Sequence, residues 1–215
     1  MDSMSQRKST RVFLLSPASC GGRRAQVLLR DAAAFPLAQQ VRNGGASLAD
    51  VFTFLSGLYF RGKVAYARAF ARPPRGAEPA LVITSSRGLV PLAVNVTIED
   101  LREFATVPIG SDSTHYRAAL ERTARALEAR IDAETRVVLL GSIASGKYVD
   151  TLLEIFGERL RFPEEFVGRG DMSRGSLMLR CAESALELTY VPIDGRARHG
   201  KRPPKLEPRR WPRPV

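Results

Sequence analysis

The sequence predicts one α/β domain at residues 11–193, a three-layer sandwich with a mainly parallel central sheet. Three observations lead to this fold class. Short apolar runs bounded by turns recur along the chain, helical segments alternate with them, and loops of small residues follow the runs. Strands that alternate with helices are typical of a parallel sheet covered on both faces. With 215 residues and 44% hydrophobic content, the chain can bury the core that one such domain needs.

The apolar runs predict the strands of this sheet. Each run is short, and a turn or loop follows it, as expected of a buried strand. In chain order the expected strands are 11–16, 80–84, 135–140, 159–162, 177–181 and 186–192. The last two are expected to close the domain as a hairpin.

Helices are expected between the strands. Their ranges are 23–33, 47–56, 64–71, 113–131 and 148–156, with a further helix that starts after Thr97. Three of these helices carry start signals. Ser47 is a good N-cap with Asp50 three residues on, Thr97 and Asp100 form a capping-box-like pair, and Ser113 precedes the long amphipathic helix.

The two ends of the chain differ in composition from the domain. Residues 1–10 are expected to be a disordered N-terminus, and residues 194–215 a basic, proline-rich tail. From Arg196 onward the chain contains eight Lys or Arg residues and one acidic residue, Glu207, so the tail carries +7 of the chain's net charge of +11. A basic extended arm suits a phosphate backbone, whereas a solubilising tail or a strap folded back across the sheet are the alternatives. The tail residues expected to contact nucleic acid are Arg198, Lys201, Arg202, Lys205, Arg209 and Arg210.

Composition argues against several classes of protein. Two cysteines far apart do not resemble a disulfide framework, and no Cys/His set has zinc spacing, so no metal and no cofactor are expected. The polar N-terminus lacks the apolar core of a signal peptide, and no apolar stretch approaches the ~20 residues that span a bilayer. We expect a cytoplasmic protein without a membrane partner. Nucleic acid is the expected partner, DNA rather than RNA.

Three loops of small residues follow predicted strands, at 16–22, 85–91 and 141–147. Because ligands of parallel sheets bind outside the carboxyl ends of the strands, the hydroxyls in these loops are candidate ligand contacts. The candidates are Ser16, Ser85, Ser86 and Ser142. Ser16 is also a candidate catalytic residue, although no histidine is placed to activate it. Ordinary turn chemistry is the alternative for the serines.

Residues 141–147 match the G-x-x-x-x-G-K pattern of a phosphate loop, between a predicted strand and a predicted helix. Lys147 is therefore a candidate phosphate ligand. Tyr148 stands where a magnesium-binding Ser or Thr belongs, which counts against a nucleotide hydrolase. A plain anion site and a tight strand–helix turn are the alternatives.

Two charged segments complete the set of candidates. In the expected glycine-rich loop 166–175, Arg169 and Arg174 offer forked donors on either side of Asp171, the candidate catalytic carboxylate. The alternative is a surface loop held by an Arg–Asp salt bridge. In the segment 57–63, which interrupts the helical pattern with two glycines, Tyr59 could stack a base while Arg61 holds phosphate, although aromatic residues there could equally belong to the core.

The ordered loops resemble a known family. Leu14-Leu15-Ser16-Pro17, the Leu58-Tyr59 segment and Val82 to Pro91 (VITSSRGLVP) are similar to the uracil-DNA-glycosylase-like α/β domain, in the version found in archaeosine-synthase and tRNA-guanine-transglycosylase relatives and in uncharacterised bacterial proteins. The resemblance spans about residues 11–145. Other members carry a water-activating Asp or Asn in the first loop and a His before Pro-Ser in a late one. This chain has serines and Cys20 in the first loop and Ser142 in the late one, so catalysis cannot be transferred by position.

The resemblance implies an N-glycosylase that removes a base, a modified one rather than plain uracil, from DNA in base excision or in defence against phage. Asp171 would then supply the missing carboxylate, and the base would be extruded into a pocket at the strand ends. The alternative function is a non-catalytic module that binds a nucleotide or nucleic acid through a degenerate phosphate loop at Lys147.

Overall fold

The computed structural model describes residues 9–110, 112–144, 146–195, 200–201, 203–204 and 206–207. Most of the expected N-terminal segment 1–10 therefore lies outside the described residues. Thr10 is described, and its carbonyl oxygen accepts a hydrogen bond from the Arg136 amide at 3.0 Å. Thr10, which directly precedes the first strand, is thus held to the sheet by this bond.

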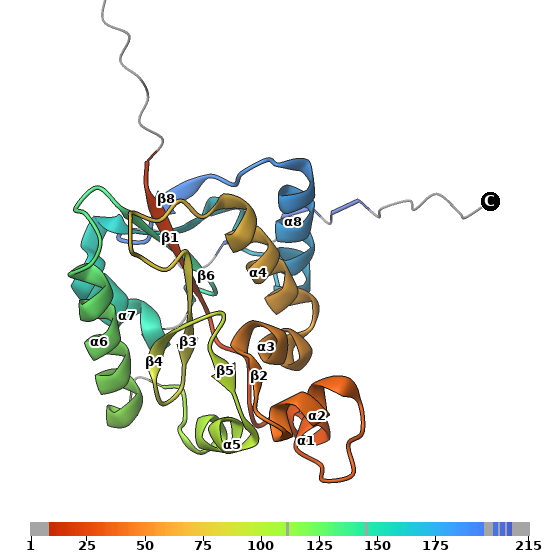
Figure 1. Cartoon of the computed structure of the whole chain (residues 1–215). Coiled ribbons are helices and arrows are strands. Elements are labelled where there is room, and N and C mark those ends of the chain that lie inside the picture. Colours follow the sequence, from red (N-terminus) through yellow and green to blue (C-terminus); the bar gives the residue numbers. More distant parts are fainter. Residues whose placement is uncertain are drawn as a thin grey trace, which may run out of the picture.

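A six-stranded sheet forms the centre of the molecule (Figure 1). From edge to edge its strands are β4 (Gly88–Pro91), β3 (Ala80–Thr84), β1 (Arg11–Leu15), β6 (Arg136–Leu140), β7 (Leu160–Pro163) and β8 (Tyr190–Pro192). The four inner strands run parallel, whereas β4 and β8 pair antiparallel at the two edges. The prediction of an α/β domain with a mainly parallel sheet is confirmed.

Strand β1 lies in the middle of the sheet. Phe13 is in register with Ala80 of β3 on one side and with Val138 of β6 on the other. All five residues of β1 are buried, which explains why Val12 to Leu15 are apolar without the alternation of a half-exposed strand. Arg11, the charged exception, pairs with Glu187. The residue that follows this strand is therefore placed at the centre of the sheet's carboxyl edge.

Helices cover both faces of the sheet. Figure 1 shows α6 (Thr114–Glu128) and α7 (Gly146–Phe156) on one side, with α4 (Leu58–Phe70) and α8 (Asp171–Ser184) on the other. Helices α4 and α8 also pack tightly against each other. Short 3-10 turns, η1 (Gly157–Arg159) and η2 (Glu164–Phe166), flank β7. The arrangement is that of helices layered on a central sheet.

A group of smaller elements lies toward the carboxyl end of β1 (Figure 1). It comprises α1 (Arg23–Leu28), α2 (Pro36–Arg42), α3 (Leu48–Ser56), α5 (Ile98–Thr106) and the antiparallel pair of β2 (Ala46–Ser47) and β5 (Asn95–Val96). These elements surround the edge of the sheet where ligands of open α/β folds bind.

The predicted helix starts are confirmed. The Ser47 side chain accepts a hydrogen bond from the Asp50 amide. Thr97 and Asp100 form a complete capping box, in which each side chain accepts from the other residue's amide. Ser113 caps α6 in the same way through the amide of Tyr116. Caps are local contacts, and this is why the sequence predicts them well.

The prediction for residues 177–181 is wrong. They belong to α8 rather than to a strand, because Gly175, Met178 and Cys181 recur every three residues and bury one helical face. Residues 186–192 contribute only β8, which pairs with β7. The expected loop at 166–175 is also only partly a loop, since Gly170 is the N-cap of α8 and Asp171 its first residue.

The expected loop at 85–91 is largely a strand. Residues 88–91 form β4, and Thr84 pairs with Gly88, so that only residues 85–87 remain as a hairpin turn. Gly88 has a φ of 69°, a left-handed angle that suits glycine at this turn. This loop is therefore too short to fold over a ligand by itself.

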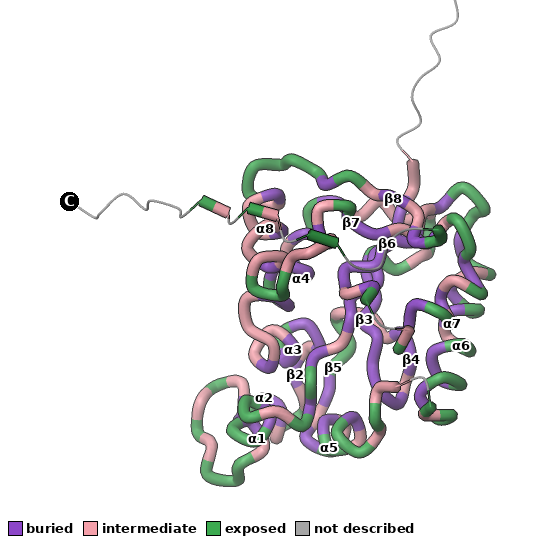
Figure 2. The backbone as a smooth tube through the Cα atoms, turned by 180° about the vertical axis from the view of Figure 1, so that it is seen from behind, coloured by how far each residue is buried: buried purple, intermediate pink, exposed green. Residues whose placement is uncertain are grey.

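The pattern of burial agrees with the layers. In Figure 2 the buried stretches follow the sheet strands, and exposed stretches follow the outer sides of the helices. None of the helices in the part of the chain that the structure describes is long and apolar enough to cross a membrane.

Candidate functional site

The candidate site begins where β1 ends. Ser16 follows the last residue of this strand, and its amide donates to the carbonyl oxygen of Leu140 at the end of β6, at 3.2 Å. A pocket of about 450 Å³ opens beside it, and its lining includes Phe104, Lys147 and Tyr148. Ser16 therefore lines a pocket on the carboxyl edge of the two central strands.

A buried lysine contacts Ser16 from the neighbouring helix layer. Lys63 of α4 has no exposed surface, and its Nζ donates to the carbonyl oxygen of Ser16 at 2.9 Å and to its Oγ at 2.6 Å. The same Nζ lies 3.9 Å from the centre of the Tyr59 ring, a cation–π distance. Three contacts thus hold the amino group in one orientation against the serine hydroxyl.

Burial gives this lysine an unusual protonation equilibrium. Desolvation disfavours the ammonium form and lowers the pKa of Lys63 to about 7; Asp171 opposes this fall and Arg174 adds to it. Near neutral pH, Lys63 can therefore exist as an amine, the form that accepts a proton. An amine beside a hydroxyl is an arrangement that activates serine nucleophiles.

Tyr148 closes the pocket next to Ser16. Its hydroxyl donates to the carbonyl oxygen of Ser142 at 2.7 Å, and burial raises the pKa of Tyr148 to about 12 although a hydrogen bond with Ser16 opposes the rise. Gly141 has no room for a side chain here, because a Cβ would lie 2.7 Å from the Cβ of Ser16. The loop that follows β6 is therefore pressed against Ser16.

Asp171 and Arg174, in the first turn of α8, lie within electrostatic range of this group, although neither is among the described residues that line the pocket. Both act electrostatically on Lys63, Tyr59 and Tyr148. The Asp171 side chain is 68% exposed and Arg174 only 11%, and their closest atoms lie 3.8 Å apart. The group thus has a buried base at Lys63 and an exposed carboxylate at its outer end.

Several predicted residues do not join this group. The Ser85 hydroxyl donates to the carbonyl oxygen of Phe104, and that of Ser86 donates to Glu103, so both serve to hold α5. Neither serine is among the described residues that line the pocket. Arg61 is exposed on α4.

Arg169 is also engaged elsewhere. It donates to the carbonyl oxygen of Glu165 at 3.0 Å, to the hydroxyl of Ser173 and to the carbonyl oxygen of Pro204. Its guanidinium therefore links the start of α8 to the tail.

The phosphate-loop candidate is only partly described. Lys147 is exposed and lines the pocket beside Ser16, but Ser145 lies outside the described residues. Ser142 accepts a hydrogen bond from the Ala144 amide, which is ordinary turn chemistry. Because Tyr148 points back to the Ser142 carbonyl, the position that binds magnesium in phosphate loops is filled by a phenol.

Only part of the basic tail is described. Lys201 is exposed, whereas Arg198, Arg202, Lys205, Arg209 and Arg210 lie outside the described residues. The carbonyl oxygens of Pro204 and Glu207 accept hydrogen bonds from Arg169 and Arg180. Here the tail contacts α8 rather than crossing the sheet.

Lys63, the central residue of the site, belongs to the predicted segment 57–63 but was not among the predicted site residues. It lies three and four residues after Phe60 and Tyr59, both buried on the same side of α4. The sequence pattern that could have identified it is a lysine on the apolar face of a helix. The prediction interrupted the helix at 57–63, whereas α4 begins at Leu58, so this face was not recognised.

Comparisons of the chain with protein-family models, with curated proteins and with solved structures found no match. The resemblance to the uracil-DNA-glycosylase-like domain therefore stays a prediction.

Proposed function

We propose that this protein is a hydrolase that removes a base from DNA, with the Ser16–Lys63 pair as its active centre. One observation carries the proposal. A wholly buried lysine with a pKa of about 7 lies 2.6 Å from the hydroxyl of a serine that lines a pocket on the carboxyl edge of the sheet. Perturbed bases in such pockets are concentrated at catalytic sites.

The chemistry assigned to the site is hydrolysis of an N-glycosidic bond. Neutral Lys63 takes a proton, through the Ser16 hydroxyl, from a water molecule that attacks C1′ of the sugar. The C1′–N bond breaks, its electron pair leaves with the base, and the base takes a proton from solvent. The Asp171 carboxylate stabilises the positive charge that develops on the sugar. Lys63 then returns its proton to solvent.

The choice of DNA rests on the motif resemblance and on the net charge of +11. Tyr59, which the sequence analysis expected to stack a base, does not have that role in the proposal. Its ring is 6% exposed and is occupied by the Lys63 amino group, so it cannot also stack a base.

The test is release of bases from oligonucleotides that contain uracil, hypoxanthine or alkylated, oxidised and hypermodified bases, scored as abasic sites. We expect one of these substrates to react. Lys63→Met and Ser16→Ala should slow that reaction about 100-fold or more, and Asp171→Asn about 10-fold or more. Arg68→Gln is the matched control, because Arg68 is an exposed cation on the same helix. Absence of abasic sites with every substrate would reject the proposal.

A second function is favoured by the 2.6 Å contact itself. In an acyl hydrolase the Ser16 Oγ would attack an ester or amide carbonyl, Lys63 would take the Oγ proton and pass it to the leaving group, and water would then release the acyl group. An electrophilic fluorophosphonate should then label Ser16 in the natural chain and not in Lys63→Met. Labelling without base release would select this function.

The non-catalytic alternative predicts neither reaction. A chain that only binds nucleic acid would hold it through Lys147 and the tail. Deletion of residues 196–215 should then weaken DNA binding and flatten its dependence on salt, because fewer phosphates are neutralised. Unchanged binding after the deletion would remove the tail from every version of the proposal.

A further inference from the structure

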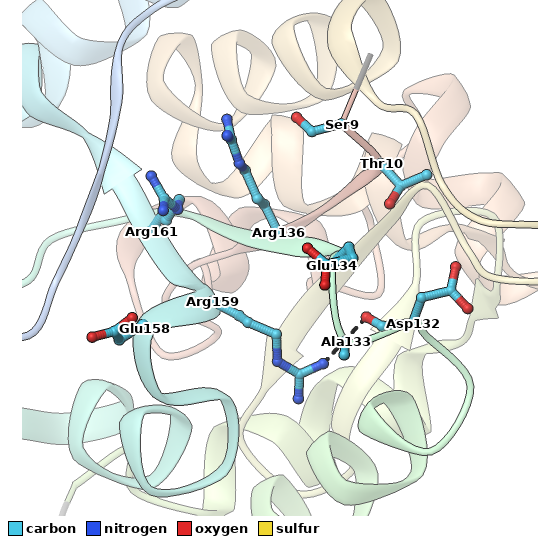
Figure 3. Close-up of a pocket in the computed structure, with 9 residues that line it drawn as sticks. All are labelled: Ser9, Thr10, Asp132, Ala133, Glu134, Arg136, Glu158, Arg159 and Arg161. Atoms are coloured by element: carbon cyan, nitrogen blue, oxygen red, sulfur yellow. Dashed lines mark hydrogen bonds between the residues drawn. The ribbon is translucent and has the colours of Figure 1, made fainter. Parts of the chain in front are cut away.

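A second pocket lies at the opposite edge of the sheet from Ser16. It has a volume of about 680 Å³ and is found where β1, β6 and β7 begin (Figure 3). The residues drawn in Figure 3 include three arginines, Arg136, Arg159 and Arg161. All three are partly buried, so their charges are less screened than those of freely exposed side chains.

Arg136 and Arg161 project from one face of the sheet. The register of β6 and β7 pairs Val138 with Arg161, and Arg136 is two residues before Val138. Because side chains two apart on a strand share a face, both guanidinium groups lie on the same side. Figure 3 shows them side by side, on neighbouring strands.

Neither of these two arginines forms an ion pair with a described carboxylate. The ion pairs of the described residues include neither of them, whereas Arg159 in the same pocket pairs with Glu128 at 2.8 Å. The pKa of Arg161 is lowered by burial and next by the charge of Arg136, with Glu158 opposing. Two cations therefore repel each other in a place that a bound anion would stabilise.

The donors of Arg161 are also incompletely used. Its Nη1 donates to the carbonyl oxygen of Tyr190 at 3.2 Å, which holds the side chain in place. Its Nε is buried and has no hydrogen-bond partner among the described residues. A buried donor without a partner is costly, and an oxyanion in the pocket would supply one.

We propose that this pocket binds the phosphate group of a nucleotide-sized ligand, with Arg136 and Arg161 as the two guanidinium donors. Ser9 and Thr10 also line the pocket, and its volume exceeds what one phosphate fills. Three carboxylates, those of Asp132, Glu134 and Glu158, also line the pocket. Carboxylates beside a phosphate site suit the hydroxyl groups of a sugar. The site is independent of Ser16 and Lys63, since it lies at the other end of the strands.

The experiment is calorimetric titration of the full chain, in phosphate-free buffer of fixed ionic strength, with pyrophosphate, AMP and a short single-stranded DNA. We expect Kd for pyrophosphate to rise at least 10-fold in Arg161→Gln and in Arg136→Gln. Arg130→Gln should leave it unchanged, because Arg130 is exposed and the variant removes the same charge. Thermal melting of each variant without ligand establishes that it is folded.

The three ligands separate two sources of the phosphate. If AMP binding falls with pyrophosphate binding while DNA binding does not, the ligand is a free nucleotide. A matching fall for DNA assigns the pocket to its backbone. Equal affinity of pyrophosphate for the natural chain and for both folded variants, or no measurable binding to the natural chain, would overturn the proposal. Base release is measured separately on the natural chain, so failure of this pocket to bind phosphate does not decide the proposal for Ser16 and Lys63.

Discussion

Gly62 and Gly175 meet where α4 crosses α8. A Cβ built on Gly62 would lie 2.6 Å from the carbonyl oxygen of Gly175, and one built on Gly175 would lie 2.7 Å from the carbonyl oxygen of Leu58. The two backbones therefore touch without side chains between them. Lys63 directly follows Gly62, and α8 begins at Asp171, so this crossing brings the buried amine and the carboxylate into one group.

Gly62→Ala should lower the free energy of unfolding by about 1–3 kcal/mol, because the added methyl group forces the two helices apart. Denaturant titration measures the change. Gly110→Ala is the matched control, since a Cβ there meets nothing within 4 Å, and its stability should change little. If both variants are equally stable, the helices are not in contact at Gly62.

Lys63 should make stability depend on pH. Its pKa is about 7 in the folded protein and about 10.4 in an unfolded chain, so between these values the unfolded chain binds the extra proton. The stability of the natural chain relative to Lys63→Met should therefore increase with pH in this window, by up to about 1.4 kcal/mol per unit. Below pH 7 the difference should be constant. A difference that stays flat from pH 6 to 10 would contradict the burial of a neutral amine.

The Arg11–Glu187 pair should contribute far more than a surface pair. Arg11 is 5% exposed in its side chain and contacts Glu187 at 2.6 Å, with a second bond from Nε to the carbonyl oxygen of Phe70. Glu187→Ala leaves a buried guanidinium without its counter-ion and should cost about 3 kcal/mol. Glu121→Ala removes a carboxylate from the exposed pair with Arg125 and should cost no more than about 0.5 kcal/mol. Similar losses for both variants would show that burial does not set the strength of the first pair.

Cys20 should be unreactive although it lines the pocket. Burial raises its pKa to about 12, so the thiolate fraction at pH 8 is about 1,000-fold below that of a free cysteine. Iodoacetamide should therefore label Cys20 in the folded chain at least 100-fold more slowly than in denaturant, as followed by mass spectrometry. Ser19→Cys supplies the control, because residue 19 is exposed in the same loop and its thiol should react quickly. Rapid labelling of Cys20 would instead make it a candidate nucleophile.

Local features of the sequence predicted most of the elements. The caps at Ser47, Thr97 and Ser113 and the apolar runs of the inner strands depend on residues within a few positions of one another, so a single stretch of sequence contains the whole signal. The small-residue loop at Ser16 could also be predicted as a ligand site from its own stretch of sequence. It directly follows a strand, and ligands of parallel sheets bind outside the carboxyl ends of the strands.

The chemistry at that edge was decided by the tertiary structure. Ser16 and Lys63 are 47 residues apart, and their contact depends on how α4 packs beside β1. Asp171 joins them only because α8 is a helix crossing α4 at two glycines, where the sequence had predicted a loop and a strand. Likewise, Arg136 and Arg161 share a face only through the register of β6 and β7. The sequence by itself determined which segments form strands and capped helices, since those depend on neighbouring residues. Only the packing of distant segments decided which side chains meet, and the burial that follows from this packing lowers the pKa of Lys63.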